Sequence, residues 1–218
     1  MKLLLPALFL MFSGCISIST YEQRMKTVRS QAAELEAANA KLAALQIRNT
    51  DLEKALEGKS EEISNVRGTY EELVQELKDS IASGEVGVSQ DEKGLTITMG
   101  NQILFASGKS DLQPKGKKVL MQVAGIIKKA NDRMIQVEGH TDNQKIVGSL
   151  KSRFPSNWDL SAARSASVVR YLQEEGGIDP ALLVLTAYAE NQPISDNATP
   201  QGRQENRRVE IILVPKKP

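Results

Sequence analysis

The sequence has very few of the side chains that build metal sites and disulfides. Its 218 residues include one cysteine, Cys15, and one histidine, His140. A single cysteine excludes an internal disulfide, and these two side chains are too small a set for the common structural zinc sites. We therefore expect neither a metal nor a cofactor, and we assign His140 a structural role.

The chain also has almost no net charge and a low aromatic content. Lysine and arginine number 28 against 27 aspartate and glutamate, a formal net charge of +1, and aromatic residues make up 4%. This balance gives no reason to expect a nucleic-acid partner. The apolar fraction of 40% is enough for a folded core, which excludes fibrous and fully disordered proteins.

No apolar run in the sequence is long enough to cross a membrane. The most apolar segment, Leu3 to Phe12, follows Lys2 and is interrupted by Pro6. Ten helical residues span about 15 Å, roughly half of the hydrocarbon core of a bilayer. A charged start, a short apolar stretch and small residues before Cys15 are typical of an export signal, which we place at 1–14.

The end of this signal resembles a bacterial lipobox, in which the cysteine thiol is lipidated and cleavage occurs just before the cysteine. It reads Phe12-Ser13-Gly14-Cys15, with phenylalanine where leucine is usual. The resemblance implies a lipid anchor on Cys15 and a linker over 15–20. Because Ile16 stands where an aspartate would retain the protein, it also implies the outer membrane, facing the periplasm. The alternative is an ordinary signal peptide that contains a cysteine.

Proline is absent from residues 21–83, where strong helix formers dominate. With Leu35 at heptad position a, apolar residues recur at positions a and d, which favours a coiled coil. Asn49 falls at an a position and favours two strands. A helix of about 60 residues measures roughly 90 Å. We expect a homodimeric coiled-coil stalk, and a single solvated helix is the alternative.

Charge is unevenly divided between the stalk and the rest of the chain. Glycines near residue 84 break the helical pattern, and a second domain is predicted to begin near Gly94. Residues 15–93 carry 10 basic and 15 acidic side chains, whereas residues 94–218 carry 17 and 12. The near-neutral chain therefore combines an acidic stalk with a basic domain.

The second domain alternates strand and helix patterns. Helices are predicted from Pro114 and over 161–175, where apolar residues recur at helical spacing. Strands are predicted at 95–99, 103–105, 134–138, 183–188 and 209–214. Strands interleaved with helices predict an α+β domain of two layers, a sheet with helices packed on it.

Four separated segments of this domain resemble the OmpA/MotB-type peptidoglycan-binding domain. They are an opening turn at 103–112, VEGHTDN at 137–143, NWDLSAARS at 157–165 and NRRVEI at 206–211. The resemblance covers 94–214 and implies an OmpA-like domain with a mixed sheet over 94–218. Residues 144–156 form a longer connection than in the shortest members, and with RFPSNW at 153–158 this region looks like the flagellar stator MotB branch.

The resemblance also implies a ligand and the residues that bind it. The family binds the diaminopimelate-containing stem peptide of peptidoglycan, whose free end is a zwitterion that needs one anion and one cation. The motif match assigns Asp142 to the ligand ammonium and Arg164 to the ligand carboxylate. It assigns the pocket wall and backbone donors to Thr141, Asn157, Leu160, Phe105 and Ala106. A structural ion pair is the alternative for Asp142 and Arg164, and a ligand contact of Arg207 or Arg208 stays open.

These features predict a non-catalytic tether that joins the outer membrane to peptidoglycan. An enzyme that cuts peptidoglycan needs an activated nucleophile, a metal-bound water or a pair of carboxylates, and the sequence indicates none of these. A MotB-like stator, or an anchor for a motor or secretion apparatus, is the alternative within the binding class. Stators of that family carry an acidic residue in a membrane-spanning helix, which the apolar run at 3–12 lacks.

Overall fold

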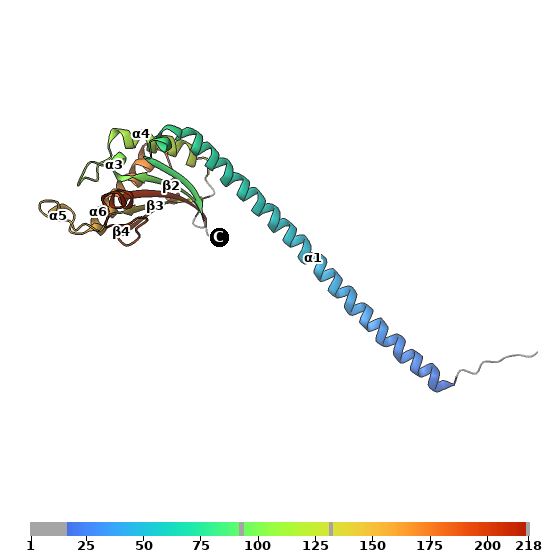
Figure 1. The fold of residues 1–218 in the computed structure, drawn as a ribbon. Helices are drawn as coiled ribbons and strands as arrows, with labels where there is room; N and C mark the ends of the chain where they lie inside the picture. Colours follow the sequence, from blue (N-terminus) through green and yellow to red (C-terminus); the bar gives the residue numbers. More distant parts are fainter. Residues whose placement is uncertain (1–16, 92–93, 131–132, 217–218) are drawn as a thin grey trace, which may run out of the picture. The chain divides into compact units, whose positions relative to one another are not determined.

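The computed structural model describes residues 17–91, 94–130 and 133–216 (Figure 1). The chain divides into two compact units, residues 1–60 and 61–218. The predicted signal segment 1–14 and the predicted lipid site Cys15 lie outside the described residues. A search of the described helices finds none that is both long enough and apolar enough to cross a membrane.

Helices and strands alternate along the second unit, after one long helix that begins in the first. In chain order they are α1 (Ile18–Glu76), α2 (Lys78–Ala82), β1 (Val86–Asp91), β2 (Gly94–Gly100), α3 (Asn101–Leu104), α4 (Pro114–Ile127), β3 (Arg133–His140), α5 (Leu150–Arg153), α6 (Asn157–Glu174), the 3₁₀ turn η1 (Pro180–Leu182), β4 (Leu183–Ala189), α7 (Pro200–Asn206) and β5 (Arg208–Pro215).

Helix α1 is the predicted long helix. It continues without a break through Gly58 and Gly68, because the strong helix formers around these two glycines offset their low propensity. Within the first unit the predicted heptad seam is open to solvent. Its leucines are between 49% and 72% exposed, namely Leu35, Leu42, Leu45, Leu52 and Leu56.

The same seam becomes buried from Val66 onward, within the second unit. Val66, Leu73 and Leu77 are 9%, 0% and 1% exposed and are part of the hydrophobic core. The side-chain amide of Gln122 in α4 donates a hydrogen bond of 3.0 Å to the Glu76 carboxylate. From Val66 onward the heptad seam therefore packs in the core of the second unit. The exposed leucines belong to the part of the seam that precedes Val66.

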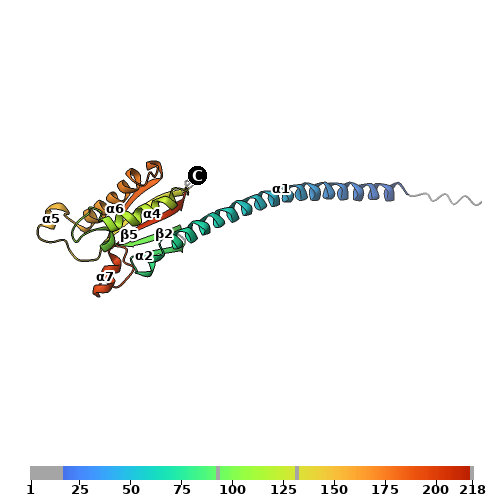
Figure 2. The same ribbon diagram turned by 90° about the horizontal axis from the view of Figure 1, so that it is seen from above.

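The second unit is built on a five-stranded sheet in the order β1-β2-β5-β3-β4. Strands β3 and β4 are parallel, whereas the other neighbouring pairs are antiparallel, which confirms the predicted mixed sheet. A parallel pair needs a crossover connection, and α6 supplies it between β3 and β4. Helices α4 and α6 lie together on one side of the sheet (Figure 2).

The core lies between this sheet and its helices. Alternate residues of a strand point to the same face, so Ile97, Ile135 and Ile211 from three strands meet Leu120 of α4 and Leu172 of α6. All five side chains are fully buried, with exposed fractions of 0%. This two-layer arrangement confirms the predicted α+β class.

Strand β3 and helix α6 approach each other unusually closely at Gly139. A Cβ atom placed on Gly139 would lie 2.4 Å from the carbonyl oxygen of Ser161, well inside van der Waals contact. Only a glycine allows this approach without displacing one of the two backbones. The contact fixes the end of β3 against the first turns of α6.

Some local predictions differ from the structure. Residues 103–105 were predicted as a strand. Ile103 and Leu104 instead end the short helix α3, and Phe105 forms only an isolated bridge to Leu112. A short apolar run cannot be assigned by periodicity alone, because Ile103 and Leu104 are buried equally well in a helical turn. Strand β1, which reads VGVSQD, and the seven-residue helix α7 were not predicted.

The start of α6 also differs from its prediction. The helix begins at Asn157, four residues before the predicted start at 161. Ser156 and Asp159 cap it, because the Asp159 carboxylate accepts hydrogen bonds from the backbone N–H and the hydroxyl of Ser156 at 2.9 and 2.6 Å. The hydrogen bonds of Ser156 hold the pKa of the Asp159 carboxyl below its ordinary value.

Candidate functional site

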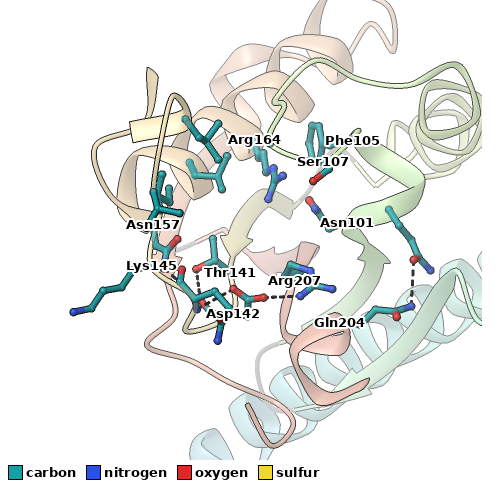
Figure 3. A pocket seen from close by; sticks show the side chains of 17 residues that line it. Asn101, Phe105, Ser107, Thr141, Asp142, Lys145, Asn157, Arg164, Gln204 and Arg207 are labelled. Atoms are coloured by element: carbon teal, nitrogen blue, oxygen red, sulfur yellow. Dashed lines mark hydrogen bonds and ion pairs between the residues drawn. The ribbon is translucent and has the colours of Figure 1, made fainter. Parts of the chain in front are cut away.

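A pocket of about 470 Å³ lies at the end of the sheet where β3 ends and β5 begins (Figure 3). Side chains from segment 101–108, from the loop 141–147, from the first turns of α6 and from the junction of α7 with β5 line it. The site therefore joins residues that are more than a hundred positions apart in the sequence.

Asp142 reaches the pocket from the loop that follows β3. The backbone N–H of Thr141 donates to the carbonyl of Ala189 at 2.8 Å, which ties this loop to the end of β4. The Asp142 side chain is 10% exposed. Its Oδ1 accepts the backbone N–H of Gln144 at 3.1 Å, and its Oδ2 pairs with Nη1 of Arg207 at 2.5 Å. These two contacts hold the Asp142 carboxylate at one side of the pocket.

Arg164 reaches the pocket from the second turn of α6. The residue is 4% exposed, its Nε–H donates to the carbonyl of Lys109 at 3.1 Å, and its guanidinium lies 5.3 Å from the centre of the Phe105 ring. Burial, together with the positive charge of Arg207, lowers the pKa of Arg164 to about 10, while Asp142 acts in the opposite direction. The guanidinium therefore remains charged at pH 7.

No ion pair joins Arg164 to an acidic side chain within the described parts of the chain. The carboxylate of Asp142 is paired with Arg207 instead. A buried cation without an anion at hydrogen-bonding distance is costly to maintain. The pocket thus presents a guanidinium that a ligand carboxylate would stabilise.

The remaining predicted site residues surround these two charges. Thr141, Asn157, Leu160 and Phe105 all line the pocket, whereas Ala106 is not among its lining residues. The side-chain amide of Asn157 donates to the carbonyls of Asp142 and Gln144 at 3.3 and 3.1 Å. Asn157 therefore holds the loop that carries Asp142 against the start of α6.

Of the two adjacent arginines, the side chain of Arg207 lies in the pocket and that of Arg208 lies outside it. Successive residues of a strand face opposite sides, and the chain enters β5 at this point. Arg207 lines the pocket beside Asp142 (Figure 3). Arg208 is 3% exposed and donates through Nε to the Glu210 carboxylate at 2.6 Å, away from the pocket.

Sequence reasoning missed several other lining residues. Lys145, Ile146 and Val147 belong to the long connection, and Asn101 and Gln204 come from α3 and α7. The length of the connection at 144–156 was a signal that its residues differ from the shortest members. Helices α3 and α7 were not predicted, so the sequence did not indicate that Asn101 and Gln204 line the pocket.

The pocket has more positive than negative charge. Arg164, Arg207 and Lys145 line it together with a single acidic side chain, Asp142. Planar guanidinium groups pair bidentately with carboxylates. The arrangement suits a small ligand that carries at least one carboxylate and offers an ammonium group to Asp142.

Comparisons with known proteins agree with this architecture. A family model described as "OmpA family" matches residues 104–207. Motility protein B of Bacillus subtilis (strain 168) is 31% identical over 156 residues, which are 72% of this chain and 58% of that protein. The chain thus spans little more than half of the length of this relative.

Two further similarities come from Pseudomonas aeruginosa. The outer-membrane lipoprotein YfiB is 30% identical over 129 residues, covering 59% of this chain and 72% of that protein. The solved structure of the cell wall anchor of the T6SS is 30% identical with a TM-score of 0.59, and the match covers 66% of this chain and 97% of that one.

Proposed function

Because the chain belongs to the OmpA family, we propose that its second unit binds the stem peptide of peptidoglycan in the pocket that holds Asp142 and Arg164. The binding is non-covalent and involves no catalytic step. A similar solved structure is named a cell wall anchor, which supports the proposal. The protein would accordingly fix another part of the cell envelope to the wall.

The observation that carries the proposal is the presence of two separated, buried charges of opposite sign in one pocket. The free end of diaminopimelate carries an ammonium and a carboxylate. Asp142 offers a carboxylate to the ammonium, and Arg164 offers a guanidinium to the ligand carboxylate. Arg207 now occupies Oδ2 of Asp142, so it must share this oxygen with the ligand or turn toward the ligand carboxylate.

Co-sedimentation of the full chain with purified diaminopimelate-type sacculi tests the site. We expect Asp142→Asn and Arg164→Ala each to weaken binding roughly 10- to 100-fold, because a hydrogen bond to a charged group contributes about 1.5–3 kcal/mol. Asp111→Asn and Arg170→Ala are matched controls, since both side chains are exposed and lie outside this pocket. Binding that both site variants leave intact would remove the assignment.

The preference for diaminopimelate has its own test. Sacculi whose stem peptides carry lysine end in an ammonium without the neighbouring carboxylate. Such sacculi satisfy Asp142 but leave Arg164 without a partner. We expect the wild-type chain to bind them at least tenfold more weakly, whereas equal binding of the two types would exclude the proposed role of Arg164.

The proposal includes an anchor in the outer membrane through lipidated Cys15. The similar protein YfiB is named an outer-membrane lipoprotein, which supports this location. Labelled palmitate should enter the wild-type chain and should not enter Cys15→Ser. Equal labelling of the two chains would overturn the anchor and would favour the alternative of a MotB-like or secretion-associated anchor held in another way.

The proposal also includes a homodimer formed by α1. The support is the exposed seam in the first unit, where leucines at heptad positions face solvent. A second copy that pairs along this seam would bury them. The peptidoglycan pocket lies wholly in the second unit, so binding by one chain does not require the dimer.

A further inference from the structure

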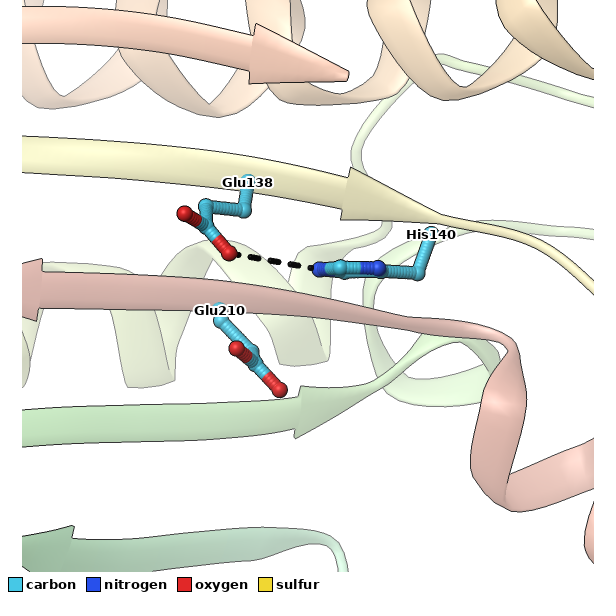
Figure 4. Close-up of side chains that lie close together, drawn as sticks. All are labelled: Glu138, His140 and Glu210. Carbon is cyan, nitrogen blue, oxygen red and sulfur yellow. Dashed lines mark ion pairs between the residues drawn. The ribbon is translucent and has the colours of Figure 1, made fainter. Parts of the chain in front are cut away.

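A group of three ionisable side chains lies on the face of the sheet opposite α4 and α6 (Figure 4). Glu138 and His140 come from β3, and Glu210 comes from β5; they are 2%, 2% and 8% exposed. Gly139, between the first two, faces Ser161 of α6, so its neighbours point away from the helices. None of the three lines the peptidoglycan pocket.

The sheet register brings these side chains together. Glu138 pairs directly with Glu210 across the antiparallel strands β3 and β5, and His140 follows two residues later on the same face. One ligand atom from each residue lies within 4.8 Å of the other two. Two carboxylates placed opposite each other repel. Arg208 pairs with Glu210, and a cation between the two carboxylates would remove the remaining repulsion.

His140 supplies an independent observation. Neither of its ring nitrogens has a hydrogen-bond partner among the described residues, although the side chain is 1% exposed. Its Nε2 faces Oε2 of Glu138 at 3.5 Å, and its ring stacks on Tyr188 with centroids 5.3 Å apart. Buried polar atoms are usually paired, so these imidazole nitrogens lack an expected partner.

Each of the two carboxylates also accepts a hydrogen bond from a neighbouring side chain. The Gln136 amide donates to Oε1 of Glu138 at 2.5 Å, and Nε of Arg208 donates to Oε1 of Glu210 at 2.6 Å. Outer hydrogen bonds of this kind orient the carboxylates that serve as metal ligands.

We propose that Glu138, His140 and Glu210 form a binding site for a divalent transition-metal ion of the zinc class. One imidazole nitrogen and two carboxylate oxygens match the donors of Zn²⁺, whereas Ca²⁺ and Mg²⁺ prefer sites made of oxygen alone. The ion would link β3 to β5 next to the strand end that carries Asp142. Its role is to stabilise the fold, because the three ligands do not reach the peptidoglycan pocket.

From the sequence, His140 is predicted to be structural, because no second histidine or free cysteine accompanies it. The structure shows two glutamates beside it. Glu138 stands two residues before His140 on β3. Glu210 is far away in the sequence, and only the β3–β5 register brings it beside the imidazole. The proposed ion does not depend on the proposed peptidoglycan binding, so either proposal can fail alone.

Zinc titration of the full chain tests the site. The chain is purified as Cys15→Ser, which removes the only thiol, and is freed of metal with a chelator. Because His140 is the only histidine, its ring C–H signals in an NMR spectrum report the site directly. We expect one Zn²⁺ per chain, a shift of these signals, and a rise in Tm that 1 mM Mg²⁺ does not produce.

Variants identify the ligands. His140→Gln and Glu210→Gln should each weaken Zn²⁺ binding at least about 100-fold, since even outer partners of metal ligands account for 10- to 100-fold in affinity. Glu174→Gln, an exposed acid on α6, is the control and should bind as the wild type does. Absence of saturable binding to the wild-type chain, or His140 signals that zinc does not move, would overturn the proposal even if a variant fails to fold.

Discussion

At the scale of single residues, three features constrain the side chain of Arg164. Its stem is buried, its Nε–H is used by the Lys109 carbonyl, and its guanidinium lies over Phe105. The hydrogen bond and the aromatic contact fix the plane of the guanidinium, so its two terminal nitrogens are already oriented to pair with a ligand carboxylate. A lysine has neither this plane nor the Nε–H donor.

We therefore expect Arg164→Lys to keep the charge and still lose most of the affinity. The dissociation constant for a soluble diaminopimelate-containing muropeptide should rise roughly 10-fold or more, since at least one charge-assisted hydrogen bond is lost. Isothermal titration calorimetry measures it, with Arg170→Lys as the matched control on the same helix. An unchanged constant would show that the positive charge alone is recognised.

At this scale the sequence motifs indicate which residues share the pocket, whereas the fold decides between neighbouring residues that the motifs cannot distinguish. Asp142 and Arg164 were predicted from separate motifs, and the structure brings both to one pocket. Arg207 and Arg208 could not be distinguished, because only the position at which β5 begins decides which of the two adjacent side chains faces Asp142.

At the scale of elements, the packing of β3 on α6 positions both charges. Asp142 follows β3 and Arg164 belongs to α6, so their separation depends on how closely the strand and helix approach. Gly139 sets this approach, since its position leaves no room for a side chain against the Ser161 carbonyl. Sequence alone showed a glycine at a strand end but gave no reason for it.

Gly139→Ala should lower the free energy of unfolding by about 1–3 kcal/mol, because the added methyl group overpacks a rigid backbone contact. A loss of this size corresponds to a fall in Tm of a few degrees or more, measured by thermal unfolding followed by circular dichroism. Gly125→Ala is the control, since nothing lies within 4 Å of a Cβ there. That exposed helical position should instead gain up to about 1 kcal/mol.

Element types were predicted well where periodicity was long and poorly where segments were short. The predicted strands at 134–138, 183–188 and 209–214 are confirmed within β3, β4 and β5. The long helix predicted over residues 21–83 is confirmed up to Glu76 as α1, and the separate short helix α2 follows it. Short α3 was mistaken for a strand because four residues make only about one helical turn, which is too short to show a repeating pattern.

At the scale of the whole molecule, the heptad stripe of α1 has two environments. The repeat continues from Leu35 to Leu77 in the sequence, and sequence alone cannot show that its last members pack in the core of their own chain. The exposed part, which the proposed dimer uses, ends before Val66.

Leu45→Glu should convert the proposed dimer to a monomer, because it places a charge at position d in the middle of the exposed seam. Analytical ultracentrifugation of the full chain at micromolar concentration measures the change. Ala43→Glu adds the same charge outside positions a and d and should leave the dimer intact. A wild-type chain that sediments as a monomer would disprove the dimer.

The burial of Leu73 and Leu77 also determines where the chain can be cut. A fragment that begins at Gly94 lacks both leucines and strand β1, so the apolar surface that they cover becomes exposed. We expect the loss of each leucine to lower the free energy of unfolding by roughly 1.5–3 kcal/mol. A fragment that begins at Glu61 keeps the whole compact unit. A protease acting on the native chain should therefore release a resistant product that retains the end of α1.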